Sequence, residues 1–354
     1  KTFLLALASA VVLSGCSGSG QQMTAYDAQY LDYFDTITSI TICAESEEQF
    51  AEYKHLAEDT MEKYHELFDI YDNYDGVNNI KTINDNAGIA PVTVDPEIIR
   101  LLEFSRQEYE ETGGKINVAM GSVLSVWHDY REAGIENPSR AQVPGQQELQ
   151  RAAEHVNLDE VQIDEEASTV YLPDEDMSLD VGAIAKGYAT KCLAEKLKEA
   201  GVTSALLSLG GNVETIGTKA DGKPWRVGVQ NPDTSAAKAY LHVLKLTDTC
   251  LVTSGTYQRY YEVDGVRYHH IIDPKTGYPA ESGLVSVTIV STDGTLADGL
   301  STSLFIMGEE KAADFWREHK DEFDAILMSD DGTLYVTEGL ENDFSTERTV
   351  EIIR

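Results

Sequence analysis

The sequence predicts an α+β fold in which mixed, largely antiparallel sheets pack against helices. Strand-like and helix-like segments alternate irregularly along the 354 residues, and several strand pairs are separated only by hairpin turns. A parallel, doubly wound sheet would instead require a regular alternation of strands and helices. The composition, with 42% hydrophobic and 25% charged residues, is that of a globular protein and excludes disordered, collagen-like and coiled-coil classes.

The first half of the chain contains both kinds of element. A strand is predicted where β-branched residues gather, and helices where apolar residues recur at helical spacing. Pro96 favours a helix start, and Gly113 with Gly114 favours a helix end. The predicted elements are a strand at 33–43, a helix at 47–69, a turn at 71–76, a helix at 96–112 and, within a polar surface segment at 131–176, a short helix at 146–155.

The second half of the chain has clearer secondary-structure signals. Residues 257–272 predict a hairpin, because Asp264-Gly265 is a strong turn signal between two strand-like runs. The other predicted elements are helices at 186–200, 295–306 and 309–319, strands at 204–209, 225–229 and 285–290, and two closing strands on either side of Asp331-Gly332.

The N-terminus predicts export from the cytoplasm. Its apolar run is too short to span a bilayer, and Leu13-Ser14-Gly15-Cys16 resembles a bacterial lipobox in which Cys16 is lipidated. A soluble signal peptide that is simply cleaved is the alternative. We expect a lipoprotein signal peptide at 1–15, a flexible tether at 16–30, and a single domain at 31–354 that two intimately packed lobes could build. The expected location is the outer face of the bacterial cytoplasmic membrane, with the protein anchored there by lipid.

The chain is strongly acidic, which limits its ligands. Lys and Arg total 27 against 61 Asp and Glu, so the formal net charge is −34. Such a charge repels phosphate backbones, and nucleic acid is therefore excluded as a partner. An anionic small molecule needs a local cation, a metal ion or a helix N-terminus in order to bind.

Two glycine-containing stretches suit a ligand that approaches the backbone. In residues 179–189, small residues lead into a helix start, where Lys186 could offset phosphate charge and Asp180 could accept hydrogen bonds from a ligand. An ordinary helix start packed by small residues is the alternative. Residues 208–212 form a strand that runs into paired glycines, which fits either a hairpin or a ligand contact.

A third stretch carries two histidines. His269 and His270 precede an Asp273-Pro274 turn and could supply a base or bind a metal, although the lack of a third spaced ligand argues against zinc. A turn with incidental histidines is the alternative.

The fourth stretch, residues 297–302, begins a helix. Asp298 and Thr302 are four residues apart and share a helix face, with Ser301 beside them, so they could bind one hard cation such as magnesium. The alternative is an aspartate that the helix dipole favours at this position.

Five motifs follow one another in a fixed order. They are Asp-x-Gly-Ala-Ile-Ala-Lys-Gly-Tyr-Ala (180–189), Leu-Gly-Gly-Asn (209–212), Thr-Ser-Gly (253–255), His-Ile-Ile-Asp-Pro-Lys-Thr-Gly-Tyr-Pro (270–279) and Ala-Asp-x-x-x-Thr (297–302). In this order they resemble the ApbE family of FAD:protein FMN transferases, and the resemblance extends over about 31–338.

The resemblance implies FAD as the substrate and Mg²⁺ as the cofactor. It implies that Asp180 and Lys186 contact FAD, and that the Ala183 carbonyl holds magnesium together with Asp298 and Thr302. Ser301 is a further candidate metal ligand. The implied lining of the FAD pocket consists of Phe34, Tyr71, Ala119, Met120, Gly121 and the strand from His270 to Ile272.

The implied reaction is transfer of FMN to protein. A Thr or Ser hydroxyl of an acceptor protein attacks the FMN-side phosphorus, FMN remains on the acceptor as a phosphoester, and AMP leaves. His270 and Asp273 are the candidate bases, although His270 could instead only hold the flavin or the pyrophosphate. The implied acceptors are membrane-associated electron-transfer proteins with an Asp-x-x-(Ser/Thr)-Gly-Ala-Thr-like stretch. Two alternatives stay open, namely a magnesium-dependent FAD pyrophosphatase that gives FMN and AMP, and a non-enzymatic FAD-binding lipoprotein.

Overall fold

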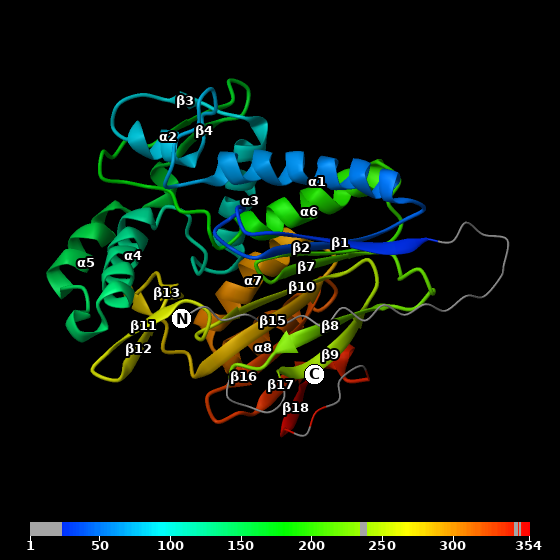
Figure 1. Cartoon of the computed structure of the whole chain (residues 1–354). Coiled ribbons are helices and arrows are strands. Elements are labelled where there is room, and N and C mark those ends of the chain that lie inside the picture. Colours follow the sequence, from blue (N-terminus) through cyan, green and yellow to red (C-terminus); the bar gives the residue numbers. More distant parts are fainter. Residues whose placement is uncertain (1–22, 234–238, 343–345, 347) are drawn as a thin grey trace.

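The central feature of the fold is a nine-stranded sheet (Figure 1). The structure is a computed structural model, and it describes residues 23–233, 239–342, 346 and 348–354. The strand order is β1-β2-β6-β7-β10-β15-β16-β17-β18, and all neighbours are antiparallel except β17 and β18, which confirms the predicted α+β class. The strands are β1 (Thr24–Tyr30), β2 (Thr38–Ala44), β6 (Ala205–Leu209), β7 (Asn212–Ile216), β10 (Cys250–Gly255), β15 (Leu284–Ser291), β16 (Phe323–Ser329), β17 (Leu334–Thr337) and β18 (Val350–Ile353).

Four helices pack on one face of this sheet. They are α1 (Glu47–Phe68), α6 (Ala185–Glu199), α7 (Gly294–Met307) and α8 (Glu309–Glu318). Helix α7 lies against β10 and β15 and is covered by α6, which in turn lies under α1 in Figure 1. Because α7 is enclosed in this way, apolar side chains such as Leu300, Leu304 and Phe305 are buried around much of its circumference.

A hairpin covers the opposite face of the sheet. It consists of β8 (Trp225–Gln230) and β9 (Tyr240–Leu246). Side chains of β15 alternate between the two cores, since Val287 and Ile289 pack towards α7 whereas Val290 packs towards this hairpin. The part of the sheet from β10 to β17 is therefore covered on both sides, and α7 packs against β10 and β15.

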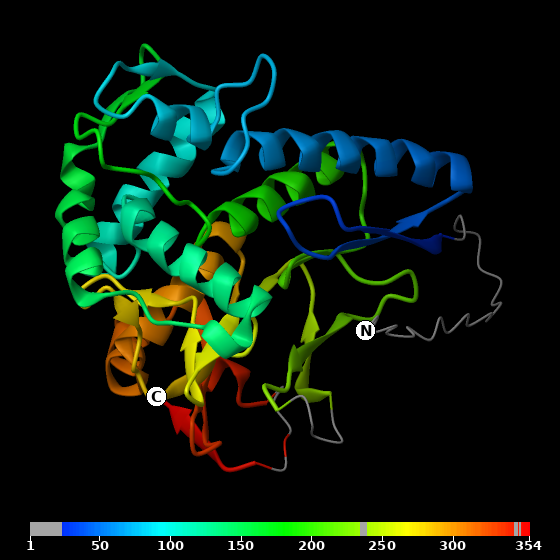
Figure 2. The ribbon, with the colours of Figure 1, turned by 60° about the vertical axis from the view of Figure 1, so that its left-hand side comes forward.

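A second group of elements stands beside the sheet and forms the other wall of the cleft described below. In Figure 2 its cyan-to-green helices lie next to the yellow hairpins. Trp127, Met120, Tyr261 and Ile272 share one apolar cluster, which joins the helix at 121–136 to those hairpins. The helices of the group are α2 (Ile80–Asp85), α3 (Pro96–Glu111), α4 (Gly121–Glu136) and α5 (Gln146–Ala152), with short 3-10 turns η1 (Pro138–Arg140), η2 (Ala153–His155) and η3 (Leu158–Glu160), and a further turn η4 (Glu338–Leu340) follows β17. The short strands are β3 (Val92–Thr93), β4 (Gln162–Asp164), β5 (Thr169–Tyr171), β11 (Tyr260–Val263), β12 (Val266–His269), β13 (Ile272–Asp273) and β14 (Tyr278–Pro279).

Two predictions for the N-terminal region were wrong. Residues 24–30, expected to belong to a tether at 16–30, form β1 and pair with β2 along their whole length. The strand expected at 33–43 begins only at Thr38, because the preceding residues form a turn in which Phe34 and Asp35 adopt positive φ angles of 54° and 49°. This turn points residues 34–36 into the cleft.

Most of the predicted elements lie where the sequence places them. The five long helices that were predicted (α1, α3, α6, α7 and α8) begin and end within one or two residues of the predicted bounds, and the predicted hairpin turns at Asp264-Gly265, both with positive φ. Helix α4, which is as long as α3, was not predicted, and neither were α2, β7, β9 and β10. The polar segment at 131–176 contains the expected short helix, but it also contains the end of α4 and the strands β4 and β5, which were not predicted. β18 was not predicted either.

The predicted lipid anchor is not part of the described structure. The signal peptide at 1–15 and Cys16 lie outside the described residues, so their roles stay predictions. Within the described part of the chain, no helix combines the length and apolar character needed to cross a membrane.

Candidate active site

A cleft of about 660 Å³ opens between the sheet with α6 and α7 on one side and α4 with the neighbouring hairpins on the other. Its lining contains as many Lys and Arg as Asp and Glu residues, although the chain as a whole has 27 Lys and Arg against 61 Asp and Glu. The charged lining residues are Lys115, Arg131, Lys186 and Arg259 against Asp35, Asp69, Asp180 and Asp298. The cleft is therefore a place where the acidic chain can accept an anionic ligand.

A carboxylate and a hydroxyl on α7 face this cleft. Asp298 and Thr302 both line it, as their i, i+4 spacing predicts. Asp298 is 4% exposed, and its Oδ2 accepts a hydrogen bond of 2.8 Å from the Gly187 backbone N–H. Burial raises the pKa of Asp298, whereas the Lys186 ammonium and hydrogen bonds from Gly187 and Asn212 oppose that rise. A cation bound beside Asp298 would lower its pKa further and so favour the ionised carboxylate.

The close approach of α6 and α7 depends on Gly187. A Cβ atom there would lie 2.3 Å from the Gly294 carbonyl oxygen and 2.6 Å from Cβ of Asp298. Without a side chain, the first turn of α6 presents its backbone directly to the Asp298 carboxylate. The glycine in the Lys-Gly-Tyr-Ala motif thus positions a side chain that lies 111 residues away.

The start of α6 contributes a second group of ligand contacts. Asp180 Oδ1 accepts a hydrogen bond of 2.8 Å from the Gly182 N–H, and burial raises the pKa of Asp180. Lys186 Nζ donates to the Gly182 carbonyl at 2.8 Å and lies 3.9 Å from Oδ2 of Asp298. Ala183 lines the cleft between them. The start of α6 therefore places Asp180 and Lys186 in the cleft, with Lys186 next to the Asp298 carboxylate of α7.

The atoms near Asp298 suit a hard cation. Carboxylate, hydroxyl and backbone carbonyl oxygens are the ligands that Mg²⁺ takes, usually one or two carboxylates with water and phosphate. Asn212 also lines the cleft, and its buried Oδ1 has no hydrogen-bond partner among the described residues. A buried acceptor without a partner indicates that a ligand or its water completes the site.

Ser301 does not face the cleft. Its side chain is fully buried, and its Oγ donates to the Asp298 carbonyl at 2.9 Å and lies 2.8 Å from Oγ of Ser254. Ser254 Oγ also lies 3.2 Å from Oγ1 of Thr302. These contacts give Ser301 the role of orienting the hydroxyl of Thr302 through Ser254.

Aromatic and apolar side chains form the opposite wall. Trp127 lines the cleft and stacks on Tyr268 with ring centroids 5.9 Å apart, and its Nε1–H donates to the Gly277 carbonyl at 2.7 Å. Phe34, Met120 and Ile272 line the cleft too, as predicted. This wall can hold a planar ring system such as a flavin.

Residues 119–121 are placed by backbone pairing with residues 178–180. The Asp180 N–H donates to Val118 O at 2.8 Å, and the Gly121 N–H donates to Ser178 O at 3.0 Å. Met120 reaches the cleft, whereas Ala119 and Gly121 are buried behind its surface.

The two candidate bases differ in position. His270 lines the cleft, and its Nδ1 lies 3.2 Å from the Arg259 carbonyl oxygen, so an Nδ1–H would donate there and leave Nε2 unprotonated. Burial, together with the nearby cations Arg259 and Lys186, lowers the pKa of His270. Asp273 lies outside the lining, caps its own turn through the Lys275 N–H at 3.0 Å, and lies 3.6 Å from Lys115 Nζ.

Tyr71 lies at the mouth of the cleft. Its ring packs on that of His128 with centroids 5.2 Å apart, and its hydroxyl lies 3.4 Å from His128 Nδ1. Arg131 Nη2 lies 2.9 Å from the same nitrogen. Tyr71 was predicted to line the pocket, but His128, Arg131 and Arg259 were not, because no motif distinguishes them from other surface residues.

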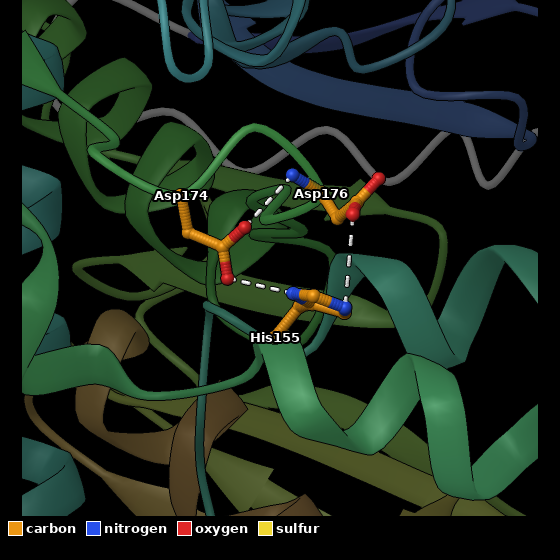
Figure 3. A group of neighbouring side chains, drawn as sticks. All are labelled: His155, Asp174 and Asp176. Atoms are coloured by element: carbon orange, nitrogen blue, oxygen red, sulfur yellow. Dashed lines mark hydrogen bonds and ion pairs between the residues drawn. The ribbon is translucent and has the colours of Figure 1, made fainter.

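A polar cluster outside the cleft contains His155 between two aspartates (Figure 3). His155 Nδ1 lies 2.6 Å from Oδ2 of Asp174, and its Nε2 lies 3.8 Å from Oδ2 of Asp176. The hydrogen bond with Asp174 raises the pKa of His155. Because the two ring nitrogens face different carboxylates, the arrangement suits a protonated imidazole that forms ion pairs with Asp174 and Asp176. These ion pairs fix the segment that leads to Asp180.

Fold and cleft together define a class of protein. It is an α+β protein that can hold an anionic ligand with a planar ring between an aromatic wall and a carboxylate–hydroxyl pair suited to a cation. A model of the ApbE family matches residues 34–327. The chain belongs to the ApbE family, as the order of its motifs predicted.

The chain is similar to known proteins over most of its length. The FAD:protein FMN transferase of Treponema pallidum is 36% identical over 274 residues, which are 74% of this chain and 73% of that protein. The FAD:protein FMN transferase of Klebsiella pneumoniae is 35% identical over 252 residues, 71% of this chain and 75% of that protein. The crystal structure of the ApbE protein from Thermotoga maritima is 28% identical, has a TM-score of 0.78, and covers 91% of this chain and 100% of its own.

Proposed function

We propose that this protein transfers the FMN part of FAD to a Thr or Ser side chain of an acceptor protein, forming a phosphoester and releasing AMP. The observation that carries the proposal is the placement of Asp298 and Thr302 beside Lys186, in a cleft whose other wall is aromatic. A diphosphate with a planar ring matches both halves of this cleft. Membership of the ApbE family supports the same activity.

The proposed cofactor is Mg²⁺. Asp298, Thr302 and the Ala183 carbonyl would hold it, and the ion would neutralise diphosphate charge and act as a Lewis acid at phosphorus. Lys186 adds a positive charge next to Asp298, and Asp180 can accept hydrogen bonds from the ligand. Ser254 and Ser301 hold the Thr302 hydroxyl in place.

His270 is the proposed base for the acceptor hydroxyl. It lines the cleft, and because its pKa is lowered the imidazole is neutral at physiological pH and keeps one unprotonated nitrogen. The backbone carbonyl of Arg259 would hold the proton on Nδ1, so that Nε2 is the nitrogen that accepts the proton. Asp273 is the weaker candidate, because its carboxylate accepts a hydrogen bond within its own turn and lies near the Lys115 ammonium.

The acceptor is proposed to be a membrane-associated electron-transfer protein. The transferase would be lipid-anchored through Cys16 on the outer face of the cytoplasmic membrane, where the two proteins can meet. β1 starts at Thr24, so the proposed tether between lipid and fold is shorter than the sequence suggested. This proposal rests on the signal-like N-terminus and on the family resemblance.

A product assay tests the proposed activity against its two alternatives. The protein is incubated with FAD, MgCl₂ and an acceptor domain, and AMP, free FMN and acceptor mass are measured. Transfer gives AMP and an acceptor heavier by one FMN. AMP with free FMN and an unmodified acceptor would show a pyrophosphatase, and intact bound FAD would show a binding protein. Either of those outcomes contradicts the proposal.

A further inference from the structure

The mouth of the cleft is a second, shallower depression of about 450 Å³. It shares six of its nine lining residues with the cleft, so the two are continuous. We call these nine residues the mouth, and they are Asp35, Tyr71, His128, Arg131, Glu132, Ile135, Gln258, Arg259 and Tyr260. Any molecule that enters the cleft from this side must pass over them.

The mouth carries two arginines, Arg131 and Arg259, and two carboxylates, Asp35 and Glu132, in a chain of net charge −34. Arg259 is exposed and forms no ion pair with any residue that the structure describes. Arg131 lies near Glu132, with 3.5 Å between Nε and Oε1, and its other arm contacts His128. The guanidinium of Arg259 is therefore available to a partner, and guanidinium groups pair best with carboxylates or phosphates.

The mouth and its rim also expose several apolar side chains. Tyr71 and Ile135, which line the mouth, are 52% and 56% exposed. Leu31 and Ile37, at the two ends of the turn that carries Asp35, are 72% and 65% exposed. Exposed apolar side chains next to arginine are typical of surfaces that bind protein, in which aromatic residues and arginine supply much of the affinity.

The diphosphate of FAD already has proposed partners deeper in the cleft, at Lys186 and at the cation site of Asp298. The second substrate of the proposed reaction is a polypeptide, whose hydroxyl has to reach the phosphorus from the solvent side. It must rest on the surface around the opening while it does so. The mouth fits that requirement through its position, through its exposed apolar side chains and through the guanidinium of Arg259, which is unpaired among the described residues.

We infer that the mouth binds the acceptor polypeptide, with Arg259 and Arg131 pairing with an acidic side chain close to the hydroxyl that is modified. The inference rests on the proposed transferase function and names the feature by which the enzyme selects its acceptor. Ile135, which lines the mouth but not the deeper cleft, contributes an apolar contact that does not depend on the acidic side chain.

The experiment compares two forms of one acceptor domain, with Asp or with Asn flanking the modified Thr. For each form, kcat/KM of covalent flavin transfer is measured with the wild type, with Arg131→Gln/Arg259→Gln, and with Arg226→Gln. Arg226 is an exposed arginine on β8, in the hairpin that covers the opposite face of the sheet, so its loss is a control for net charge. The Kd for FAD is measured for each protein by flavin fluorescence.

The wild type and Arg226→Gln should prefer the Asp form by roughly tenfold or more, the ratio expected for one charge-assisted pair. The double variant should lose this preference, mainly through a higher KM for the Asp form. A preference that persists in the double variant overturns the inference, as does a raised Kd for FAD with unchanged selectivity, which would assign the arginines to the nucleotide. Failure of the wild type to label either form contradicts the transferase function itself.

Discussion

Gly187→Ala tests whether the contact between α6 and α7 positions the Asp298 carboxylate. The added Cβ would lie 2.3 Å from the Gly294 carbonyl oxygen, which backbone atoms cannot tolerate without a shift of one helix. Overpacking of this kind costs about 1–3 kcal/mol. Loss of the 2.8 Å hydrogen bond from the Gly187 N–H to a charged, buried carboxylate adds about 1.5–3 kcal/mol. The combined loss of roughly 2.5–6 kcal/mol corresponds to a fall in Tm of about 3–8 °C, because a chain of this length unfolds with an entropy of about 0.7 kcal/mol/K.

The assay measures Tm by calorimetry, together with the magnesium concentration that gives half-maximal flavin transfer. Gly145→Ala is the matched control, because a Cβ there meets no atom within 4 Å and the backbone has φ of −67°. We expect Gly145→Ala to match the wild type in both measurements. For Gly187→Ala we expect a lower Tm and a higher magnesium requirement. A Gly187→Ala variant with wild-type Tm and wild-type magnesium dependence would refute the reasoning.

Three further predictions concern single side chains. Asp298→Asn should raise the magnesium requirement about a hundredfold or more, while Asp314→Asn, an exposed change on α8, should leave the titration with MgCl₂ unchanged. The ion pair with Asp174 raises the pKa of His155, so protonated His155 stabilises the fold fully below the unfolded pKa of about 6.5, and this stabilisation is lost as pH rises through the folded pKa. The Tm difference between wild type and His155→Gln should therefore shrink from pH 6 upwards. A difference that stays constant with pH would contradict the ion pair with Asp174. Trp127→Phe removes a buried indole hydrogen bond and should lower the free energy of unfolding by about 1–3 kcal/mol in urea titrations, and an unchanged midpoint would contradict that.

The long helices, with the exception of α4, and the helix-start motifs could be predicted because their signals are local. Helix α7 is an example, since the i, i+4 spacing of Asp298 and Thr302 is enough to place both on one face. The strand onset at Thr38 could not be predicted in this way. Residues 33–37 are as suitable for a strand as those that follow, and the turn there depends on positive φ angles at Phe34 and Asp35 that no glycine signals.

Contacts between distant segments account for most of what the sequence did not predict at the site. The link from Ser301 through Ser254 to Thr302 joins α7 to β10, and Asn212, the first residue of β7, lines the same cleft as Asp298. Ser254 and Asn212 both lie in sequence motifs, but a motif marks a residue without giving its partners. His155 lies in no motif, and its ion pairs with Asp174 and Asp176 follow only from the tertiary structure.

The central claim is that this chain attaches FMN covalently to protein. The most direct measurement mixes the chain from residue 23 onward with FAD, MgCl₂ and an acceptor domain, and then records flavin fluorescence on the acceptor after denaturation and electrophoresis. We expect a fluorescent acceptor, and we expect the signal to vanish when EDTA is added or when the modified Thr of the acceptor is changed to Val. A dark acceptor in the presence of FAD and magnesium, whether AMP and FMN are released or FAD stays intact, would contradict the account.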